Sequence, residues 1–167
     1  LTSPIYYHGP LGPAKQQLQK TLSEINQAHP DVRAVISVNK GLVTQASAAI
    51  PVVPLYFAIL YKVMKRAGNH ENCIQQIARL FTQKLYTPEG FRTDENGFIR
   101  MDDYELLPEI QEEVKKCWKA VTTDTVNQYC DIDGYWEDFY HMFGFHYSDI
   151  DYTQDVDANV EINGIVM

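Results

Sequence analysis

The chain has 167 residues, 45% of them hydrophobic and 22% charged, a composition that predicts one globular core rather than a disordered segment. Its formal net charge is −8 and its lysines and arginines are dispersed, which argues against a nucleic-acid surface. The longest apolar run, residues 48–61, contains two prolines and is shorter than the ~20 residues that cross a bilayer, so we expect no membrane span.

The chain begins at Leu1 on a Pro-Ile-Tyr-Tyr run rather than at a methionine, so we expect it to be the C-terminal part of a longer polypeptide. Its three cysteines are Cys73, Cys117 and Cys130. They form no C-x-x-C pair, which indicates reduced thiols of a cytoplasmic protein rather than disulfides or a zinc site. His141 and His146 are five residues apart and lack the spacing of a helical metal pair, so we expect no metal.

Tyr6 and Lys15 are the first candidates for chemistry. Two glycines and two prolines lie between them, which excludes one continuous helix and requires a turn that can bring the phenol to the ammonium. A tyrosine beside a fixed positive charge transfers protons near neutral pH, whereas free tyrosine, with a pKa of about 10, does so poorly. The alternative is a packed terminal tyrosine and a solvated lysine.

The next segment, from Gly12 and Pro13 through Ile25, is predicted to be an amphipathic helix with Lys15 in its first turn. A cation at that position opposes the helix dipole by about 0.3–1 kcal/mol. Helix stability therefore does not explain Lys15, whereas binding an anion or tuning Tyr6 does.

A strand, a loop and a buried helix follow. Residues 33–38 form a β-branched run that predicts a strand, residues 41–47 form a loop, and a helix is predicted from Pro54 to Gly68. In open α/β sheets ligands bind at the carboxyl ends of the strands, so this loop is the expected ligand contact and Thr44 its hydroxyl.

The second half of the chain is predicted to be mainly helical. Residues 71–86 are predicted to form an amphipathic helix whose arginine and lysines make up its solvated face. Asn-Gly at residues 96–97 predicts a small β-hairpin or an extended excursion, and residues 108–121 are predicted to form another helix. The aromatic segment 134–145 predicts a short helix ending at Gly144. Its aromatic side chains belong either to the core or to an apolar pocket.

Several segments together resemble the NADH-dependent trans-2-enoyl-CoA reductase family, the FabV-type enoyl-[acyl-carrier-protein] reductases. The resemblance lies in the Tyr-x8-Lys spacing of Tyr6 and Lys15 and in the stretch Val38-Asn39-Lys40-Gly41-Leu42-Val43-Thr44-Gln45-Ala46-Ser47. It continues at residues 61–65, 70–74 and 99–106 and at the Gly-Tyr and Gly-Phe pairs of residues 134–135 and 144–145. These matches occur in order along nearly the whole chain.

The resemblance implies the C-terminal part of a Rossmann-like α/β fold related to the short-chain dehydrogenases, mostly helical with a few strands and a small β-hairpin. Residues 1–167 would then form one portion of a single-chain reductase, with the Tyr/Lys segment at 1–47 and a helical substrate-side region at 48–167. The NAD-binding half would lie elsewhere, since no G-x-G-x-x-G motif occurs in this chain. This fragment alone is expected to be inactive.

The same resemblance implies NADH-dependent reduction of the trans-2 double bond of enoyl-CoA or enoyl-acyl-carrier-protein in fatty-acid biosynthesis, by a cytoplasmic monomer. Tyr6 would donate the proton, and Lys15 would bind the cofactor and activate Tyr6. The loop residues Leu42, Val43 and Thr44 would also bind the cofactor. The walls of the acyl pocket would be Val53, Tyr61 and Tyr135.

Two positions depart from the family pattern: Pro13 stands where a basic residue is expected, and Tyr104 where a tryptophan is usual. Neither belongs to the implied chemistry, although Pro13 bears on how Lys15 is presented. Two alternative functions stay open. One is a ketone reductase related to the short-chain dehydrogenases, and the other is a non-catalytic helical interaction domain.

Overall fold

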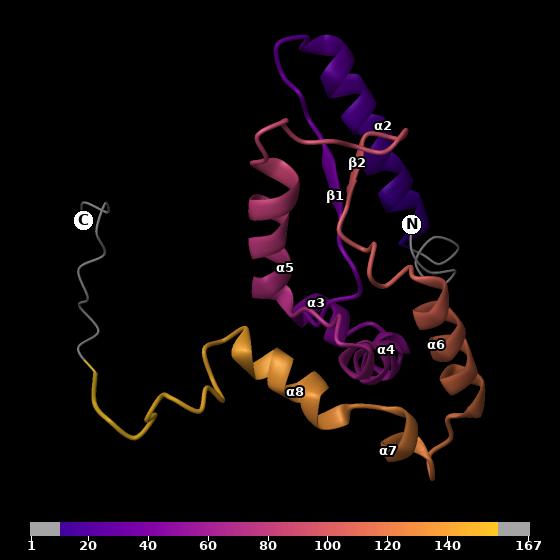
Figure 1. The fold of residues 1–167 in the computed structure, drawn as a ribbon, viewed down its shortest axis with the longest axis vertical. Coiled ribbons are helices and arrows are strands. Elements are labelled where there is room, and N and C mark those ends of the chain that lie inside the picture. Colours follow the sequence, from indigo (N-terminus) through magenta and orange to yellow (C-terminus); the bar gives the residue numbers. More distant parts are fainter. Residues whose placement is uncertain (1–10, 157–167) are drawn as a thin grey trace.

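A computed structural model describes residues 11–156 of the chain (Figure 1). The elements in order are α2 (Gly12–Ala28), β1 (Ile36–Val38), α3 (Gln45–Ala48), α4 (Val53–Ala67), α5 (Cys73–Arg79), a π-helix (Leu80–Leu85) that continues α5, β2 (Phe98–Arg100), α6 (Pro108–Ala120), α7 (Val126–Tyr129) and α8 (Ile132–His141). The described chain is thus mostly helical with a small parallel sheet, as expected for an α/β fragment. None of its helices is long and apolar enough to cross a membrane.

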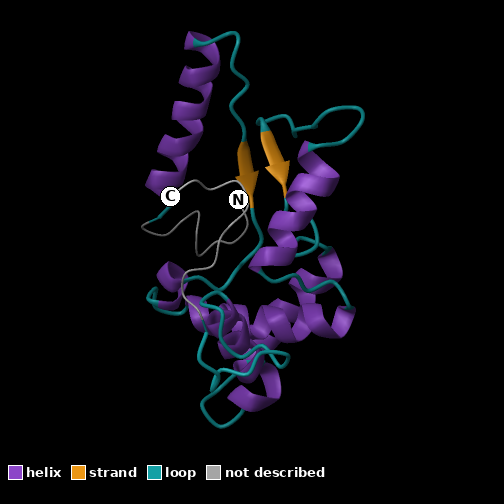
Figure 2. Ribbon diagram, turned by 90° about the vertical axis from the view of Figure 1, so that its left-hand side faces the viewer, coloured by secondary structure: helices purple, strands orange, loops and turns teal. Residues whose placement is uncertain are grey.

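The sheet consists of β1 and β2, which run parallel with Ile36 opposite Phe98 and Val38 opposite Arg100 (Figure 2). The predicted strand at 33–38 is therefore confirmed in its second half. One face of the sheet packs on α2, where Leu22 forms a small apolar cluster with Val38 and Phe98. Figure 1 shows α2 lying along the two strands.

The predicted β-hairpin at residues 96–97 is wrong. The Asn-Gly turn does form, with Gly97 at φ +80° and its N–H bonded to the Asp94 carbonyl at 3.0 Å. The carboxylate of Asp94 accepts the N–H groups of Asn96 and Phe98 at 2.9 and 3.0 Å, and the Asp94 N–H donates to the Phe98 carbonyl at 2.8 Å, so the side chain and the backbone of Asp94 both close the turn. The chain that leaves the turn then pairs with β1 in parallel, because β1 offers it an apolar neighbour and the preceding segment forms no strand.

The core is built around α4, which is apolar on nearly all sides. Ile59, Leu60 and Tyr61 are fully buried, and α6 and α8 pack against different sides of the helix (Figure 1). The predicted helix from Pro54 to Gly68 is confirmed. Gly68 ends it in a left-handed conformation at φ +76°, which suits a residue without a Cβ.

The helix predicted at 71–86 exposes the face that was expected to be buried. Its apolar residues Ile74, Ile77 and Phe81 are exposed, whereas Arg79 is buried. The guanidinium of Arg79 pairs with Glu71 at 2.6 Å and with Asp103 at 2.9 Å, and this charge network attaches the polar face to the rest of the protein. The prediction that the arginine belongs to a solvated face is therefore wrong.

We predict that Ile59→Ala lowers the free energy of unfolding by about 2–5 kcal/mol, because it removes a fully buried side chain and leaves a cavity. Ile77→Ala is the matched control, since the same atoms are removed from a side chain that is half exposed. Urea unfolding of the two variants measures the difference. Equal losses would contradict the burial of α4.

Val52, the residue before α4, has φ +73°, a left-handed conformation that is strained for a β-branched side chain. We predict that Val52→Gly raises the free energy of unfolding by about 1 kcal/mol through release of this strain. Val32→Gly is the control, because Val32 is similarly exposed but is not among the described residues with positive φ. Val32→Gly should lower the melting temperature, whereas Val52→Gly should raise it. Thermal unfolding of the two variants and wild type measures the difference.

Candidate functional site

A cavity of about 480 Å³ lies at the carboxyl end of β1. It is bounded by the first turns of α2 on one side and by the loop from Val38 to Thr44 on the other, with Phe57 of α4 and Phe98 of β2 contributing to its wall. The end of a parallel strand is where α/β proteins bind their ligands. The cavity is therefore the candidate site.

The structure brings three of the predicted cofactor residues together. Lys15, Leu42 and Thr44 all line this cavity, although Lys15 is exposed and Thr44 half-buried. Val43 does not line it, because its side chain is buried in the core beneath the loop. Tyr6 lies outside the described residues.

The predicted acyl-pocket residues lie in the core. Val53, Tyr61 and Tyr135 are buried members of the cluster around α4, and none of them is among the side chains that line the cavity. Tyr61 nevertheless reaches the loop, since its hydroxyl accepts the N–H of Val43 at 2.8 Å.

Thr44, the predicted ligand hydroxyl, forms a capping box with Ser47 at the start of α3. Its hydroxyl oxygen accepts the Ser47 N–H at 3.0 Å, and its own N–H donates to Ser47 Oγ at 2.8 Å. Ser47 Oγ also donates to the carbonyl of Leu42 at 3.1 Å. The side of the loop next to α3 is thus ordered by its own hydrogen bonds.

Sequence reasoning missed two buried charges beside the cavity, Lys40 and Glu105. The ammonium of Lys40 donates to the carbonyl of Gly41 at 3.1 Å and lies 4.8 Å from the centre of the Tyr61 ring. The carboxylate of Glu105 accepts the Gly41 N–H at 2.6 Å and the hydroxyl of Tyr56 at 2.6 Å. In the sequence, Lys40 is visible only as part of an Asn-Lys-Gly turn, and Glu105 only as part of an acidic Asp-Asp-Tyr-Glu run. Neither pattern predicts a buried charge.

Burial perturbs both charges. It lowers the pKa of Lys40 to about 8, even though the neighbouring carboxylates of Glu105, Asp138 and Glu71 act in the opposite direction. It also raises the pKa of Glu105, against the hydrogen bonds from Tyr56 and Gly41. Lys40 is therefore still protonated at neutral pH and loses its proton in a moderately alkaline range.

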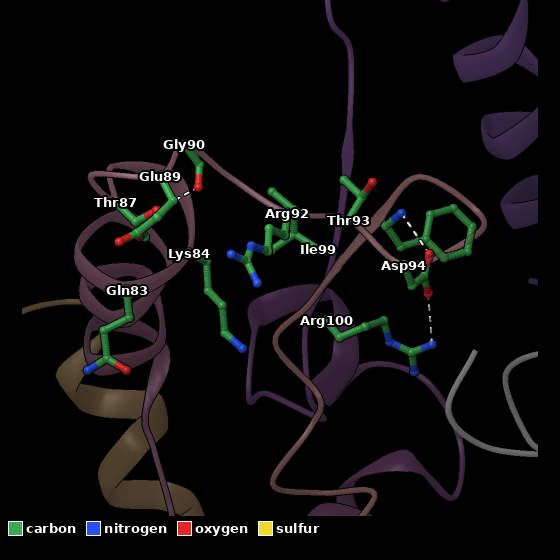
Figure 3. A pocket seen from close by; sticks show the side chains of 11 residues that line it. Gln83, Lys84, Thr87, Glu89, Gly90, Arg92, Thr93, Asp94, Ile99 and Arg100 are labelled. Carbon is green, nitrogen blue, oxygen red and sulfur yellow. Dashed lines mark hydrogen bonds and ion pairs between the residues drawn. The ribbon is translucent and has the colours of Figure 1, made fainter.

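A second cavity, of about 390 Å³, opens between the π-helix and β2 (Figure 3). Lys84, Arg92 and Arg100 line it, and Figure 3 shows Arg92 pointing inward. Two of these cations are neutralised, because Lys84 pairs with Asp103 at 2.9 Å and Arg100 pairs with Asp102 at 2.6 Å. This cavity is the weaker candidate for a charged ligand. Among the described residues no acidic, histidine and cysteine side chains cluster as metal ligands.

A cavity at the carboxyl end of a parallel strand is typical of a ligand-binding α/β protein. The family model described as "Trans-2-enoyl-CoA reductase catalytic region" matches residues 1–86, and "Enoyl reductase FAD binding domain" matches residues 93–156. The first match covers more than half of the chain, which therefore belongs to the trans-2-enoyl-CoA reductase family.

Two relatives and two solved structures agree with this assignment. The chain is 46% identical to an enoyl-[acyl-carrier-protein] reductase [NADH] of Cytophaga hutchinsonii and 44% identical to a trans-2-enoyl-CoA reductase [NADH] of Ruminiclostridium cellulolyticum, over 99% of its own length. It spans only 42% of the length of each relative.

The first structure is the trans-2-enoyl-CoA reductase of Clostridium acetobutulicum in complex with NADH, with a TM-score of 0.85 and 43% identity over 94% of this chain and 41% of that one. The second is the Treponema denticola enzyme in complex with NAD, with a TM-score of 0.82 and 45% identity over 90% of this chain and 38% of that one. Both likenesses extend over most of the described fold.

The described residues of the second family match do not fit FAD. A flavin dinucleotide needs free N–H groups for its pyrophosphate, as at an open helix N-terminus. The first turn of α6 carries Glu109, and the N-terminus of α8 is capped by the carboxylate of Asp131, which accepts the N–H of Gly134 at 3.1 Å. The carboxylate of Glu109 disfavours an anion at the first helix end, and Asp131 already occupies an N–H group of the second, so neither offers FAD a pyrophosphate site.

We predict that Lys40 makes the protein more stable as the pH rises from 7 to 9.5, by about 2 kcal/mol. The reason is that its pKa of about 8 in the folded state lies below its unfolded value of 10.5, so the unfolded chain holds the proton more strongly. This contribution is complete above the unfolded pKa and is lost as the pH falls through the folded one.

Urea unfolding of the intact protein at the two pH values measures this effect. Lys40→Met should lack the increase, relative to wild type. The charged groups that face Lys40 stay in place in that variant; they are Glu105, Asp138, Glu71 and Arg79. The same pH response in wild type and variant would show that the buried ammonium is not its source.

Proposed function

We propose that this chain forms the catalytic and substrate-side part of an NADH-dependent reductase of trans-2-enoyl thioesters, acting on enoyl-CoA or enoyl-acyl-carrier-protein in fatty-acid biosynthesis. The observation that carries the proposal is the strand-end cavity, which brings Lys15 of α2 to Leu42 and Thr44 of the loop after β1. The names of the relatives, which specify NADH and enoyl substrates, support the same reaction.

NADH fits the residues of this cavity. The backbone of the loop from Leu42 to Thr44 would flank the nicotinamide, and Lys15 would hold the ribose and phosphate region. Lys40 adds a second ammonium at the cavity, beside the carboxylate of Glu105, and a cation there favours an anionic dinucleotide. When bound, NADH supplies the hydride that reduces the β-carbon of the substrate.

Tyr6 would supply the proton. Its hydroxyl would hydrogen-bond to the thioester oxygen, where negative charge develops, and would then protonate the enolate. A donor aimed at such an oxygen is worth about 2.7–4 kcal/mol in a dry site. The charge of Lys15 would favour the phenolate form of Tyr6 after the proton has left.

The remaining parts of the proposal concern the whole polypeptide. Residues 1–47 would supply the Tyr/Lys segment and residues 48–167 the substrate side of a Rossmann-like enzyme that works as a cytoplasmic monomer. The dinucleotide-binding half would come from another part of the protein, so the fragment alone would be inactive. Val53, Tyr61 and Tyr135 would shape the acyl pocket from the core behind it.

We predict that the full-length protein consumes NADH with crotonyl-CoA, and that Tyr6→Phe slows this reaction by about two to three orders of magnitude. Lys15→Met should raise the KM for NADH and lower the rate. Both should stay folded, because Lys15 is exposed and a phenylalanine conserves the ring of Tyr6. The rate is measured as the decrease in NADH absorbance at 340 nm over time.

Lys20→Met is the matched control for Lys15→Met. Lys20 lies on the same helix, is exposed and pairs only weakly with Glu24 at 3.7 Å, so its loss should leave the kinetics unchanged. NADH binding without turnover of enoyl thioesters would favour the ketone reductase. A protein that binds no dinucleotide would favour the interaction domain.

A further inference from the structure

We infer that Glu105 and Tyr61 are positioning residues, which hold the loop at the end of β1 from the core side so that the N–H of Leu42 is presented to the dinucleotide. The inference rests on the proposed function, because it assigns these two side chains a part in binding the same cofactor. Neither of them needs to touch the cofactor to do this.

The loop lies directly on α4. A Cβ atom added to Gly41 would meet Cε1 of Phe57 at 2.6 Å and Cδ2 of Leu60 at 3.2 Å, so the backbone approaches the helix as closely as a glycine allows. A backbone this close to an apolar helix cannot give its polar groups to water. The N–H and C=O groups of Gly41 must therefore find partners within the protein.

Glu105 and Lys40 provide the partners of Gly41. The Glu105 carboxylate, 64 residues further along the chain, accepts the Gly41 N–H at 2.6 Å, while the Lys40 ammonium donates to the Gly41 carbonyl at 3.1 Å. The other oxygen of Glu105 accepts the hydroxyl of Tyr56 on α4 at 2.6 Å. Glu105 thus ties the loop to the central helix through one buried carboxylate.

Tyr61 provides the partner of Val43. Its ring is fully buried and stacks on Phe57, with ring centres 6.3 Å apart and planes at 5°. Its hydroxyl accepts the Val43 N–H at 2.8 Å. Burial raises the pKa of Tyr61 far above its ordinary value, so this hydroxyl stays neutral and serves as a fixed hydrogen-bonding group rather than a proton donor for the reaction.

These contacts leave the N–H of Leu42 for a ligand. The N–H groups of Gly41 and Val43 both point to the core side, and the N–H of Leu42 between them has no protein partner among residues 11–156. Leu42 itself lines the cavity. When the loop is already ordered, ligand binding does not carry the entropy cost of ordering it. Buried groups that position the loop therefore raise the affinity for the ligand.

The test uses the full-length protein and the dissociation constant of NADH, measured by the change in its fluorescence on binding. Tyr61→Phe keeps the ring in the core and removes only the acceptor of the Val43 N–H. We expect it to weaken NADH binding about tenfold and to raise the KM for NADH in step.

Glu105→Ala and Glu105→Gln form a graded pair. The alanine variant removes the acceptor of the Gly41 N–H and should weaken NADH binding by more than about tenfold, whereas the amide oxygen of the glutamine variant can still accept that N–H and should restore most of the affinity. Asp102→Asn is the matched control. Asp102 is an equally buried carboxylate, but it pairs with Arg100 and touches neither the loop nor the cavity.

The outcomes separate the inference from the proposed function. A folded Tyr61→Phe protein with wild-type affinity for NADH overturns the inference, as does a loss of affinity in Asp102→Asn equal to that in Glu105→Ala. If Glu105→Ala does not fold, Tyr61→Phe and Glu105→Gln give the answer. Wild-type protein that binds no NADH overturns the proposed function, and the inference with it.

Discussion

The close contact between the loop after β1 and the helix α4 is the constraint on which the site depends. Gly41 lies against Phe57, and this leaves no room for a side chain or for water between loop and helix. The apolar character of α4 is what makes the contact stable, because α6 and α8 cover its other sides and bury nearly its whole length. The N–H groups of Gly41 and Val43 are therefore satisfied by buried side chains, and the position of the cavity follows from the packing of the core.

The buried charges serve the same arrangement. Two of the buried charges have ion-pair partners, because Arg79 contacts Glu71 and Asp103 and Asp102 contacts Arg100. Lys40 has carboxylates nearby, with Glu105 acting most strongly, but it bonds directly only to a carbonyl, and burial lowers its pKa to about 8. A cation kept near the cavity at this cost to stability makes sense if an anionic ligand binds there.

The elements that local chemistry specifies could be predicted from the sequence. Pro54 and Gly68 marked the ends of α4, the β-branched run marked β1, and the family was recognised from ordered motifs that the comparisons confirm. What failed depends on distant partners. The turn at Gly97 was found, but not that the strand after it would pair with β1, and the polarity of residues 71–86 did not reveal that Arg79 would be buried between two carboxylates. Glu105 was missed for the same reason, since its partner Gly41 is 64 residues away.

The two walls of the cavity differ in how firmly they are held. The loop wall is fixed by buried hydrogen bonds to Glu105 and Tyr61. The helix wall, α2, has no side-chain cap and no acidic residue in its first turn, and it is attached through Leu22 and through paired hydrogen bonds between the side chain of Asn26 and the backbone of Ala34. A ligand that contacts both Lys15 and the loop can do so only when α2 is docked on the sheet. Binding of such a ligand therefore stabilises the docked position of α2, because the ligand binds only that form. The lysine that is unfavourable for the helix dipole then contributes to stability in the bound state, which is a physical reason for its position in the first turn.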